Sequence, residues 1–466
     1  MNLIFEGRHK KLDSYTKMMT RMNRRKKNKR YVFWLIVVLL FLAGFGTAQF
    51  LKRGQETKVV VPNDIREVSS QDSGKKDSNS SKGNGTVSNT KPTERKDQQT
   101  TEDKVNALIE KMTLSEKVGQ MLMVGFYGKQ EDDHIINLIR EQKVGGVILF
   151  DRNMQSPRQV AELTNKLKQD AESNENSIPM MIGLDQEGGP VLRMRDQVSP
   201  IPSEQKLGQN ASLEDVYDIA KLNGEELAAM GIQVDFAPVL DLSDQDERSF
   251  GSSPDKAARY GLEEVKGLND SQVTATVKHF PGNGRVVVDP HLDESIVKVD
   301  KSTLENVDMV PFKQLIAQQK ENQFFVMVTH VKYPAFDTEY PASISKIIIE
   351  DLLRKSLGFQ GIVVTDDLDM GAVSKYYSYE QLGYMAVNAG ADLLLVCHEY
   401  DHQVELYNGI IKAVQTGKLS EERINQSVKR ILTYKLEHLT NKPVSITKAD
   451  QVVRSPEHLE KIEKLK

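Results

Sequence analysis

The feature that most constrains this chain is a regular alternation of short apolar runs with longer amphipathic stretches. It begins after residue 103 and repeats eight times. Alternation of short buried strands with helices is typical of repeated βαβ units. The expected strands are Val118–Phe126, Val144–Phe150, Ile178–Asp185, Ile232–Asp241, Val273–His279, Phe324–His330, Gly361–Asp366 and Ala391–Cys397. The expected helices are His134–Gln142, Pro157–Ala171, Leu213–Met230, Pro254–Gly267, Ser302–Gln319, Ile347–Leu357, Tyr379–Ala389 and His402–Thr416.

Eight such units predict an α/β fold, namely a (β/α)8 barrel of the TIM type. A doubly wound open sheet is the alternative if one strand is misassigned. The length of 466 residues does not require a second fold, because barrels of this type commonly exceed 250 residues. Thr113-Leu-Ser-Glu116 is a capping-box pattern just before the first unit.

The N-terminus predicts a membrane anchor. A basic cluster from Arg24 to Arg30 precedes Tyr31–Leu51, which carries no formal charge. About 20 apolar residues cross a bilayer, and the basic flank stays in the cytoplasm. We therefore expect a cytoplasmic segment at 1–30, a transmembrane signal-anchor at 31–51, and the rest of the chain outside the cell membrane. A cleaved signal peptide, cut near Gly46-Thr47-Ala48, is the competing interpretation.

Composition divides the remainder of the chain. Residues 52–103 are mostly polar, with Gly and Pro, and predict a disordered linker because such a segment cannot bury a core. The barrel is expected at 104–440 and a C-terminal tail at 441–466. The net charge of −4 indicates no general attraction to nucleic acid. The one cysteine, Cys397, excludes an intramolecular disulfide and a four-cysteine zinc site.

Polar residues gather where the expected strands end. In a barrel these ends and the following loops build the active site. One polar residue at a strand end is often only a helix cap, but six strands ending this way indicate a functional site. The groups are Asp185-Gln-Glu187-Gly-Gly189, Asp241, Lys278-His279, Thr329-His330, Thr365-Asp366-Asp367 and His398.

These residue types suit hydrolysis of a glycosidic bond, which needs a carboxylate to attack the anomeric carbon and a proton carrier for the leaving oxygen. Asp366 suits the first role because it ends a very apolar strand. Asp289-Pro-His291 suits the second, since a carboxylate beside an imidazole orients it. His279, His291 and Asp289 are alternatively a metal-ligand set. We expect no metal and no cofactor.

At these residues the chain resembles the family 3 glycoside hydrolases, in their β-N-acetylglucosaminidase branch, over roughly Thr101 to Leu436. The resemblance rests on several motifs in order: Asp185-Gln-Glu-Gly-Gly189 with Arg193, Asp235-Phe-Ala-Pro-Val239, Arg248-Ser-Phe-Gly251, Lys278-His-Phe-Pro-Gly-Asn-Gly284, Asp289-Pro-His291, Gly361-Ile-Val-Val-Thr-Asp-Asp367 and Asn388-Ala-Gly-Ala-Asp392. It implies that Asp366 is the nucleophile and that His291, supported by Asp289, is the acid/base. It also implies that the terminal sugar is bound by Asp185, Arg193, Arg248, Lys278 and His279.

Two positions depart from the branch. Pro290 stands where a small hydroxylated residue is usual, and Asn283 where histidine is often found. Proline fixes φ, so Pro290 either presets the loop or limits its motion. Among other polar residues, Glu187 and Asp367 are expected to support or cap, His330 and His398 to be structural, and Cys397 to be a small core residue. Lys278 is expected to pair with Asp241 or Asp185 if its role is structural.

The resulting functional prediction is a retaining exo-β-N-acetylglucosaminidase acting on glycans, with cell-wall fragments or muropeptides as expected substrates. A phosphorylase is one alternative, because a neutral histidine repels phosphate less than a carboxylate does. A non-catalytic receptor for amino-sugar glycans is another, and a β-glucosidase a third. Oligomeric state does not follow from the sequence.

Overall fold

The computed structural model describes residues 100–319 and 323–465. The predicted segments 1–30 and 31–51, and residues 52–99 of the predicted linker, lie outside them. Within the described residues, no helix is both long enough and apolar enough to cross a bilayer.

The described strands form one parallel sheet arranged as a ring. They follow one another in sequence order, each paired with the next, and β1 also pairs with β8. Between β7 and β8 a single bridge, Val364 to Leu393, completes the ring. The strands are β1 (Leu122–Val124), β2 (Gly146–Ile148), β3 (Met181–Leu184), β4 (Val234–Asp235), β5 (Thr274–Phe280), β6 (Phe324–Val328), β7 (Val363–Thr365) and β8 (Leu394–Val396). Sequential order with paired ends supports the TIM-type barrel and excludes the doubly wound sheet.

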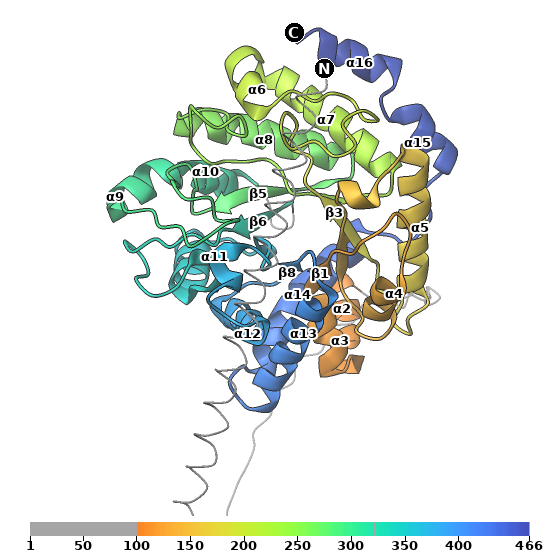
Figure 1. Ribbon diagram of the computed structural model, residues 1–466, viewed down its shortest axis with the longest axis vertical. Helices are drawn as coiled ribbons and strands as arrows, with labels where there is room; N and C mark the ends of the chain where they lie inside the picture. Colours follow the sequence, from red (N-terminus) through yellow and green to blue (C-terminus); the bar gives the residue numbers. More distant parts are fainter. Residues whose placement is uncertain (1–99, 320–322, 466) are drawn as a thin grey trace, which may run out of the picture. The chain divides into compact units, whose positions relative to one another are not determined.

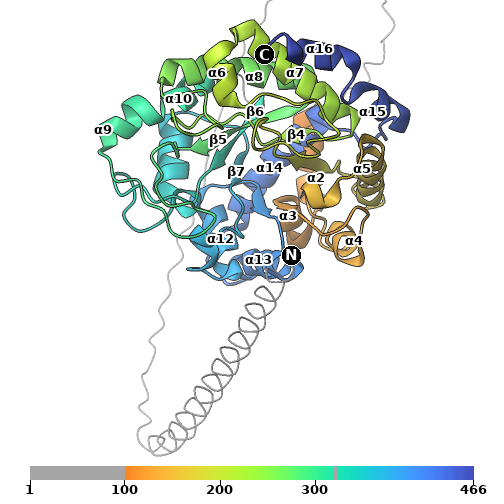
Figure 2. The ribbon, with the colours of Figure 1, turned by 45° about the horizontal axis from the view of Figure 1, so that its top comes forward.

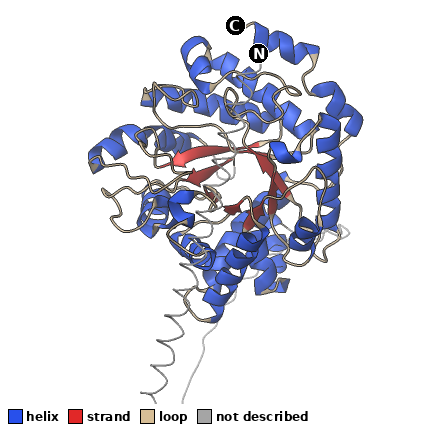
Figure 3. Ribbon diagram, viewed as in Figure 1, coloured by secondary structure: helices blue, strands red, loops and turns tan. Residues whose placement is uncertain are grey.

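Helices surround the strands, as Figures 1 to 3 show. After successive strands come α4 (Asp133–Arg140), α5 (Pro157–Glu172), α7 (Leu213–Ala229), α8 (Pro254–Asp270), α10 (Val310–Gln318), the π-helical segment η4 (Ile347–Ser356), α12 (Tyr379–Ala389) and α13 (Tyr400–Gln415). Shorter helices lie in the connections: η1 (Asp151–Asn153), α6 (Glu204–Asn210), α9 (Lys301–Thr303), η2 (Leu304–Asp308), η3 (Ala342–Ile344) and α11 (Gly371–Ser374). At the two ends of the described chain lie α2 (Thr101–Lys111), α3 (Leu114–Gln120), α14 (Glu421–His438), α15 (Ile446–Val452) and α16 (Pro456–Glu463).

Helix α14 packs at the amino ends of the strands. Tyr434 donates a hydrogen bond to Thr274, the first residue of β5, at 2.9 Å. The buried Lys435 donates to the carbonyl of Gly145, just before β2, at 2.7 Å. Because this helix occupies the amino end of the barrel, the opposite end is left for the loops that carry polar residues.

The first and fourth strands are shorter than predicted. Val118 to Gln120 are helical, because the predicted capping box at Thr113 forms and begins α3. The chain turns into β1 only after Met121. The predicted strand Ile232–Asp241 contains only Val234 and Asp235 as a regular strand, although Leu240 still donates to the Lys278 carbonyl at 2.7 Å. Pro238, which has no N–H, lies where the ladder would have continued.

Helices also form outside the predicted barrel limits of 104 and 440. Helix α2 begins at Thr101 with Thr100 as its cap, so the ordered domain starts before residue 104. The predicted tail contains α15 and α16, which pack against α7. Glu226 of α7, a buried carboxylate, accepts hydrogen bonds from the Arg454 N–H at 2.8 Å and the His458 ring at 2.9 Å. These charged contacts fasten residues 441–465 to the barrel.

Candidate active site

A cavity of about 270 Å³ opens at the carboxyl ends of the strands. Of the eight residues to which the family resemblance gives a catalytic or sugar-binding role, seven line it: Asp185, Arg193, Arg248, Lys278, His279, His291 and Asp366. The eighth, Asp289, contacts His291. Apolar residues complete the wall, and the remaining lining residues are Ile148, Phe150, Glu187, Val191, Met327, Asp367, Met370, Leu395, Cys397 and His398. The structure thus brings these strand-end residues to one cavity, whereas Thr329 and His330 are not among its lining residues.

A network of opposite charges forms one side of the cavity. The Lys278 ammonium lies 2.9 Å from Asp185 and 2.6 Å from Glu187. Arg248 donates two hydrogen bonds to Glu187, at 2.6 and 2.9 Å, and Arg193 lies 3.1 Å from Asp185. Burial alone would raise the pKa of Asp185, but Lys278 and Arg193 outweigh it and lower that pKa to about 2. The Asp185 carboxylate is therefore ionised and ready to accept hydrogen bonds from a ligand's hydroxyl groups.

The lysine of this network stays charged although it is buried. Desolvation would lower the pKa of Lys278, but Asp185 and Glu187 raise it above its ordinary value. Lys278 does not pair with Asp241, one of its two predicted partners. Glu187 was expected to support or cap, and it is the shared acceptor of Lys278 and Arg248 while also lining the cavity.

His279 is held by Asp241, which lies in the connection between β4 and α8. Its ring nitrogen Nδ1 lies 2.6 Å from the Asp241 carboxylate, which also accepts the backbone N–H groups of His279 and Asn283. This contact fixes the imidazole so that Nε2 is the nitrogen left for a ligand. Asn283 is thus engaged through its backbone, and its side-chain oxygen lies 3.2 Å from the Tyr333 hydroxyl.

Asp366 stands directly after β7 and reaches the cavity from a rigid position. Its backbone N–H donates to Val328 of β6 at 3.0 Å, and its carboxylate accepts the Asp367 N–H at 2.9 Å. Burial would raise the pKa of Asp366, but the neighbouring His279 and His330 outweigh it and hold that pKa below its ordinary value. An ionised carboxylate on a fixed strand end suits nucleophilic attack.

Asp289 and His291 form the predicted pair on the loop after β5. One carboxylate oxygen of Asp289 accepts the His291 backbone N–H at 2.9 Å and lies 2.7 Å from Nδ1 of the ring. Burial would raise the pKa of Asp289, but the hydrogen bonds and the charge of His291 outweigh it and hold that pKa below its ordinary value. With Nδ1 bonded to Asp289, Nε2 remains available for proton transfer.

Of the residues expected to be structural, His330 lies outside the cavity lining, whereas His398 and Cys397 are part of it. His330 is buried, contacts Ser343 at 2.7 Å, and contacts the Asp367 carbonyl at 2.8 Å, which agrees with a structural role. His398 lines the cavity, lies 3.2 Å from Asp367, and has its pKa raised chiefly by that contact. Cys397 is buried as expected but also lines the cavity.

The sequence reasoning missed one part of the wall. Phe150 follows β2 and lines the cavity, while the next residue, Asp151, lies 3.7 Å from Arg193. Arg152 stacks over the Phe150 ring, 4.2 Å from its centroid. The signal was present, because Phe150-Asp-Arg152 ends the second predicted strand as the other polar groups end theirs.

The described residues offer no cluster of three or more His, Cys, Asp or Glu side chains arranged to hold a metal. In the alternative metal set, His279 contacts Asp241 and His291 contacts Asp289. The two histidines thus each have a separate carboxylate partner.

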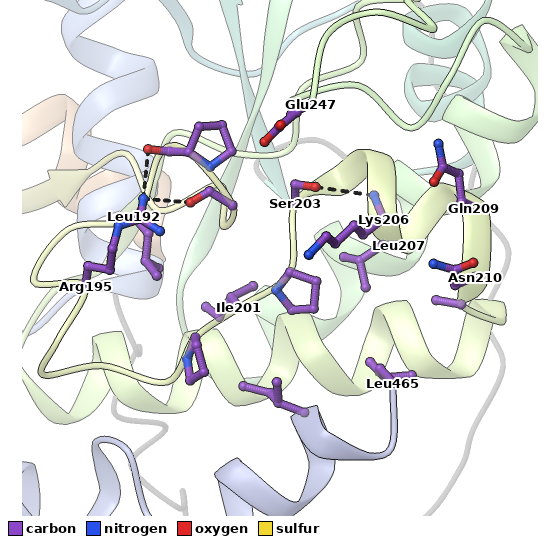
Figure 4. Close-up of a pocket in the computed structure, with 16 residues that line it drawn as sticks. Leu192, Arg195, Ile201, Ser203, Lys206, Leu207, Gln209, Asn210, Glu247 and Leu465 are labelled. Atoms are coloured by element: carbon purple, nitrogen blue, oxygen red, sulfur yellow. Dashed lines mark hydrogen bonds between the residues drawn. The ribbon is translucent and has the colours of Figure 1, made fainter.

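A larger cavity, of about 710 Å³, lies between the loop after β3, α6 and the C-terminal residues Ile462 and Leu465 (Figure 4). Half of its lining residues are Pro, Leu or Ile, and the rest are mostly polar. Arg195 at its edge donates to the backbone carbonyls of Gly189 and Pro190, at 2.7 and 3.1 Å. The residues that line this cavity do not place an acid, a base and a nucleophile close together. Its larger size alone therefore does not make it the reaction site.

Comparison with known proteins identifies the family of this chain. Residues 113–434 match the glycosyl hydrolase family 3 N-terminal domain. β-Hexosaminidase A of Pseudoalteromonas piscicida is 30% identical over 390 residues, which cover 74% of this chain and 65% of that protein. The β-hexosaminidase of Haemophilus influenzae strain PittEE is 34% identical over 310 residues, covering 65% of this chain and 84% of that protein.

A solved structure adds to these matches. The family 3 β-N-acetylglucosaminidase from Paenibacillus sp. str. FPU-7 has 38% sequence identity and a TM-score of 0.70, covering 76% of this chain and 68% of that chain. The match to the Pseudoalteromonas relative spans slightly less than two thirds of that protein's length.

Proposed function

We propose that this chain removes terminal β-linked N-acetylglucosamine from glycans with retention of configuration. The chain belongs to glycoside hydrolase family 3 and is a glycoside hydrolase. The observation that carries the proposal is that Asp366, His291 and the Lys278–Arg248 network line one cavity. Relatives named as β-hexosaminidases and a β-N-acetylglucosaminidase support the sugar. The cavity of about 270 Å³ is small for a site and suits one sugar unit, which supports exo action.

The reaction proceeds in two balanced steps. An oxygen of the Asp366 carboxylate attacks the anomeric carbon, the bond to the leaving oxygen breaks, and Nε2 of His291 gives that oxygen a proton. Water then attacks the same carbon, Nε2 takes a proton from the water, and Asp366 leaves as a carboxylate. Asp289, 2.7 Å from Nδ1, stabilises the imidazole in both of its protonation states.

The remaining residues hold the sugar. Asp185 accepts hydrogen bonds from hydroxyl groups, while Lys278 and Arg248 donate them. Each of these groups is already fixed by an oppositely charged neighbour, so binding requires little ordering of side chains. His279 donates or accepts at Nε2, because Asp241 occupies Nδ1.

The activity is tested with three chromogenic glycosides that share one leaving group: the β-N-acetylglucosaminide, the β-glucoside and the β-N-acetylgalactosaminide. We expect hydrolysis of the first to exceed that of the β-glucoside. Asp366→Ala should lose activity almost completely, and His291→Ala should lose about 10² to 10⁴-fold on substrates with poor leaving groups. Retention is checked by following the anomer first released by NMR. A first product of inverted configuration would contradict the covalent step.

An assay with added phosphate distinguishes hydrolysis from phosphorolysis. The same assay is run with and without inorganic phosphate, and the products are separated by charge. Release of free N-acetylglucosamine at an unchanged rate is expected, whereas a sugar 1-phosphate would make phosphate the acceptor. Binding of the sugar without any turnover would favour the receptor alternative.

We also propose that the enzyme is held at the cell membrane by residues 31–51, with its barrel outside and cell-wall fragments as substrates. The basic cluster before this apolar stretch supports the orientation. Membrane fractionation of cells producing the full chain, beside a variant lacking residues 31–51, tests it. Full-length protein in the soluble fraction would contradict the anchor, and a shortened secreted form would favour the signal-peptide alternative.

A further inference from the structure

The loop that carries Asp289 and His291 rests on the segment that follows the proposed nucleophile. The N–H of Gly371 donates to the His291 carbonyl at 3.1 Å, and the N–H of Ala372 donates to the Pro290 carbonyl at 3.0 Å. The two backbones are so close that a Cβ on Gly371 would lie 2.6 Å from the Leu292 carbonyl oxygen. The acid/base loop is therefore seated on the first turn of α11, five residues after Asp366.

Side chains reinforce this seat. The Asp293 carboxylate accepts a hydrogen bond from the Tyr376 hydroxyl at 2.5 Å and from the Lys375 ammonium at 3.2 Å. It also accepts the Glu294 backbone N–H at 2.8 Å. Asp293 follows His291 by two residues, while Tyr376 and Lys375 follow α11. These contacts thus join the same two segments as the backbone hydrogen bonds.

The position of His291 depends on these loop contacts, because few neighbouring atoms pack against its side chain. The side chains of His291 and Asp289 are 67% and 53% exposed, and the hydrogen bond of the His291 ring is to Asp289 on the same loop. Packing therefore does little to fix the imidazole relative to Asp366. Its position is set by where the loop backbone lies.

We propose that Asp293, Lys375 and Tyr376 form a latch that positions His291 for proton transfer. They are positioning residues, because they act through the loop and do not touch the substrate. The inference rests on the proposed function of His291 as acid/base. It adds that the nucleophile and the acid/base take their relative position from one support, the segment from Asp366 to Tyr376.

The test exploits the leaving group. The dinitrophenolate of a dinitrophenyl β-N-acetylglucosaminide leaves readily without being protonated. The sugar oxygen that leaves from the disaccharide N,N′-diacetylchitobiose must be protonated. Loss of acid catalysis therefore lowers kcat/KM only for the disaccharide. We expect Asp293→Ala and Tyr376→Phe in the full chain to lower kcat/KM for the disaccharide about 10-fold. Their values for the dinitrophenyl substrate should stay within about twofold of the unmodified enzyme.

Matched controls come from the same barrel. Tyr217 donates to Asp270 at 2.6 Å, and Lys355 pairs with Asp351 at 2.7 Å, both at the surface and on other helices. Tyr217→Phe and Asp351→Ala remove equivalent contacts and should leave both substrates unaffected. Gly371→Ala is a second route to the same result, because its Cβ pushes the loop from its seat, and it should reproduce the selective loss.

Each outcome decides the matter. Selective loss on the disaccharide in Asp293→Ala and Tyr376→Phe supports the latch. No loss, or equal loss on both substrates, overturns it. His291→Ala serves as the reference: if it shows no preference for the good leaving group, the proposed function of His291 fails, and the latch fails with it for that distinct reason.

Discussion

Replacing Glu187 with glutamine tests the charge balance beneath the proposed sugar pocket. The Glu187 side chain is 1% exposed, and the Lys278 side chain, whose ammonium lies 2.6 Å away, is 2% exposed. Removing one partner of a buried ion pair costs about 3–5 kcal/mol, because the other charge stays buried without compensation. Lys278 keeps Asp185 at 2.9 Å and Arg248 is 28% exposed, so both cations retain some stabilisation. We therefore expect the lower end, a loss of about 3 kcal/mol in the free energy of unfolding.

Urea unfolding followed by far-ultraviolet circular dichroism measures this loss. The matched control is Glu380→Gln, which breaks a 2.9 Å pair with Lys412 in which the side chains are 45% and 64% exposed. Surface pairs contribute at most about 1 kcal/mol, so the control should barely change the midpoint. KM of the Glu187 variant should also rise, because Arg248 and Lys278 lose their common acceptor. A loss no larger than that of the control would refute the reasoning.

Three further outcomes follow from the same contacts. The pKa of Asp185 is about 2 in the folded protein against 3.8 ordinarily, so the ionised carboxylate stabilises the fold and this contribution is lost as the pH falls from about 4 to about 2. Over that range the melting temperature of Asp185→Asn should therefore fall less steeply than that of the unmodified protein. Burial lowers the pKa of Lys435 from 10.5 to about 7. Between pH 7 and pH 10.5 the unfolded chain therefore binds one more proton than the folded chain, so the free energy of unfolding should rise with pH in this range. Lys435→Met should lack this rise. Pro290→Ser should lower disaccharide kcat/KM, because serine allows the loop more backbone conformations than proline does and so leaves His291 in place less of the time. A faster Pro290 variant would show instead that proline limits a required motion.

The positions of the site residues were predictable because barrel strands are short, buried and parallel. Their carboxyl ends must meet, so Asp185, Lys278 and Asp366 converge wherever the intervening helices lie. The boundaries were less predictable. An apolar run such as that around Val118 suits a buried helix as well as a strand, and the capping box at Thr113 decided the outcome locally.

Pairings between side chains could not be read from strand order. Acidic residues follow both β3 and β4, and only the geometry shows that Lys278 pairs with Asp185 and Glu187 and leaves Asp241 to His279. The same limit explains why the contacts of Asp293 were not predicted. Its partners Lys375 and Tyr376 are 82 and 83 positions away along the chain, and nothing in their local pattern distinguishes them from other surface residues.

The two proposed catalytic groups differ in exposure, and the reaction explains the difference. Asp366 must keep one position through both steps, and its strand end, hydrogen-bonded to β6, provides that. His291 must first protonate a leaving oxygen and then deprotonate an incoming water, which requires access from solvent. A side chain that is 67% exposed meets this requirement but cannot be fixed by packing. A loop anchored by its backbone and by Asp293 reconciles the two demands, because it leaves the imidazole open to water while fixing the point from which it reaches the substrate.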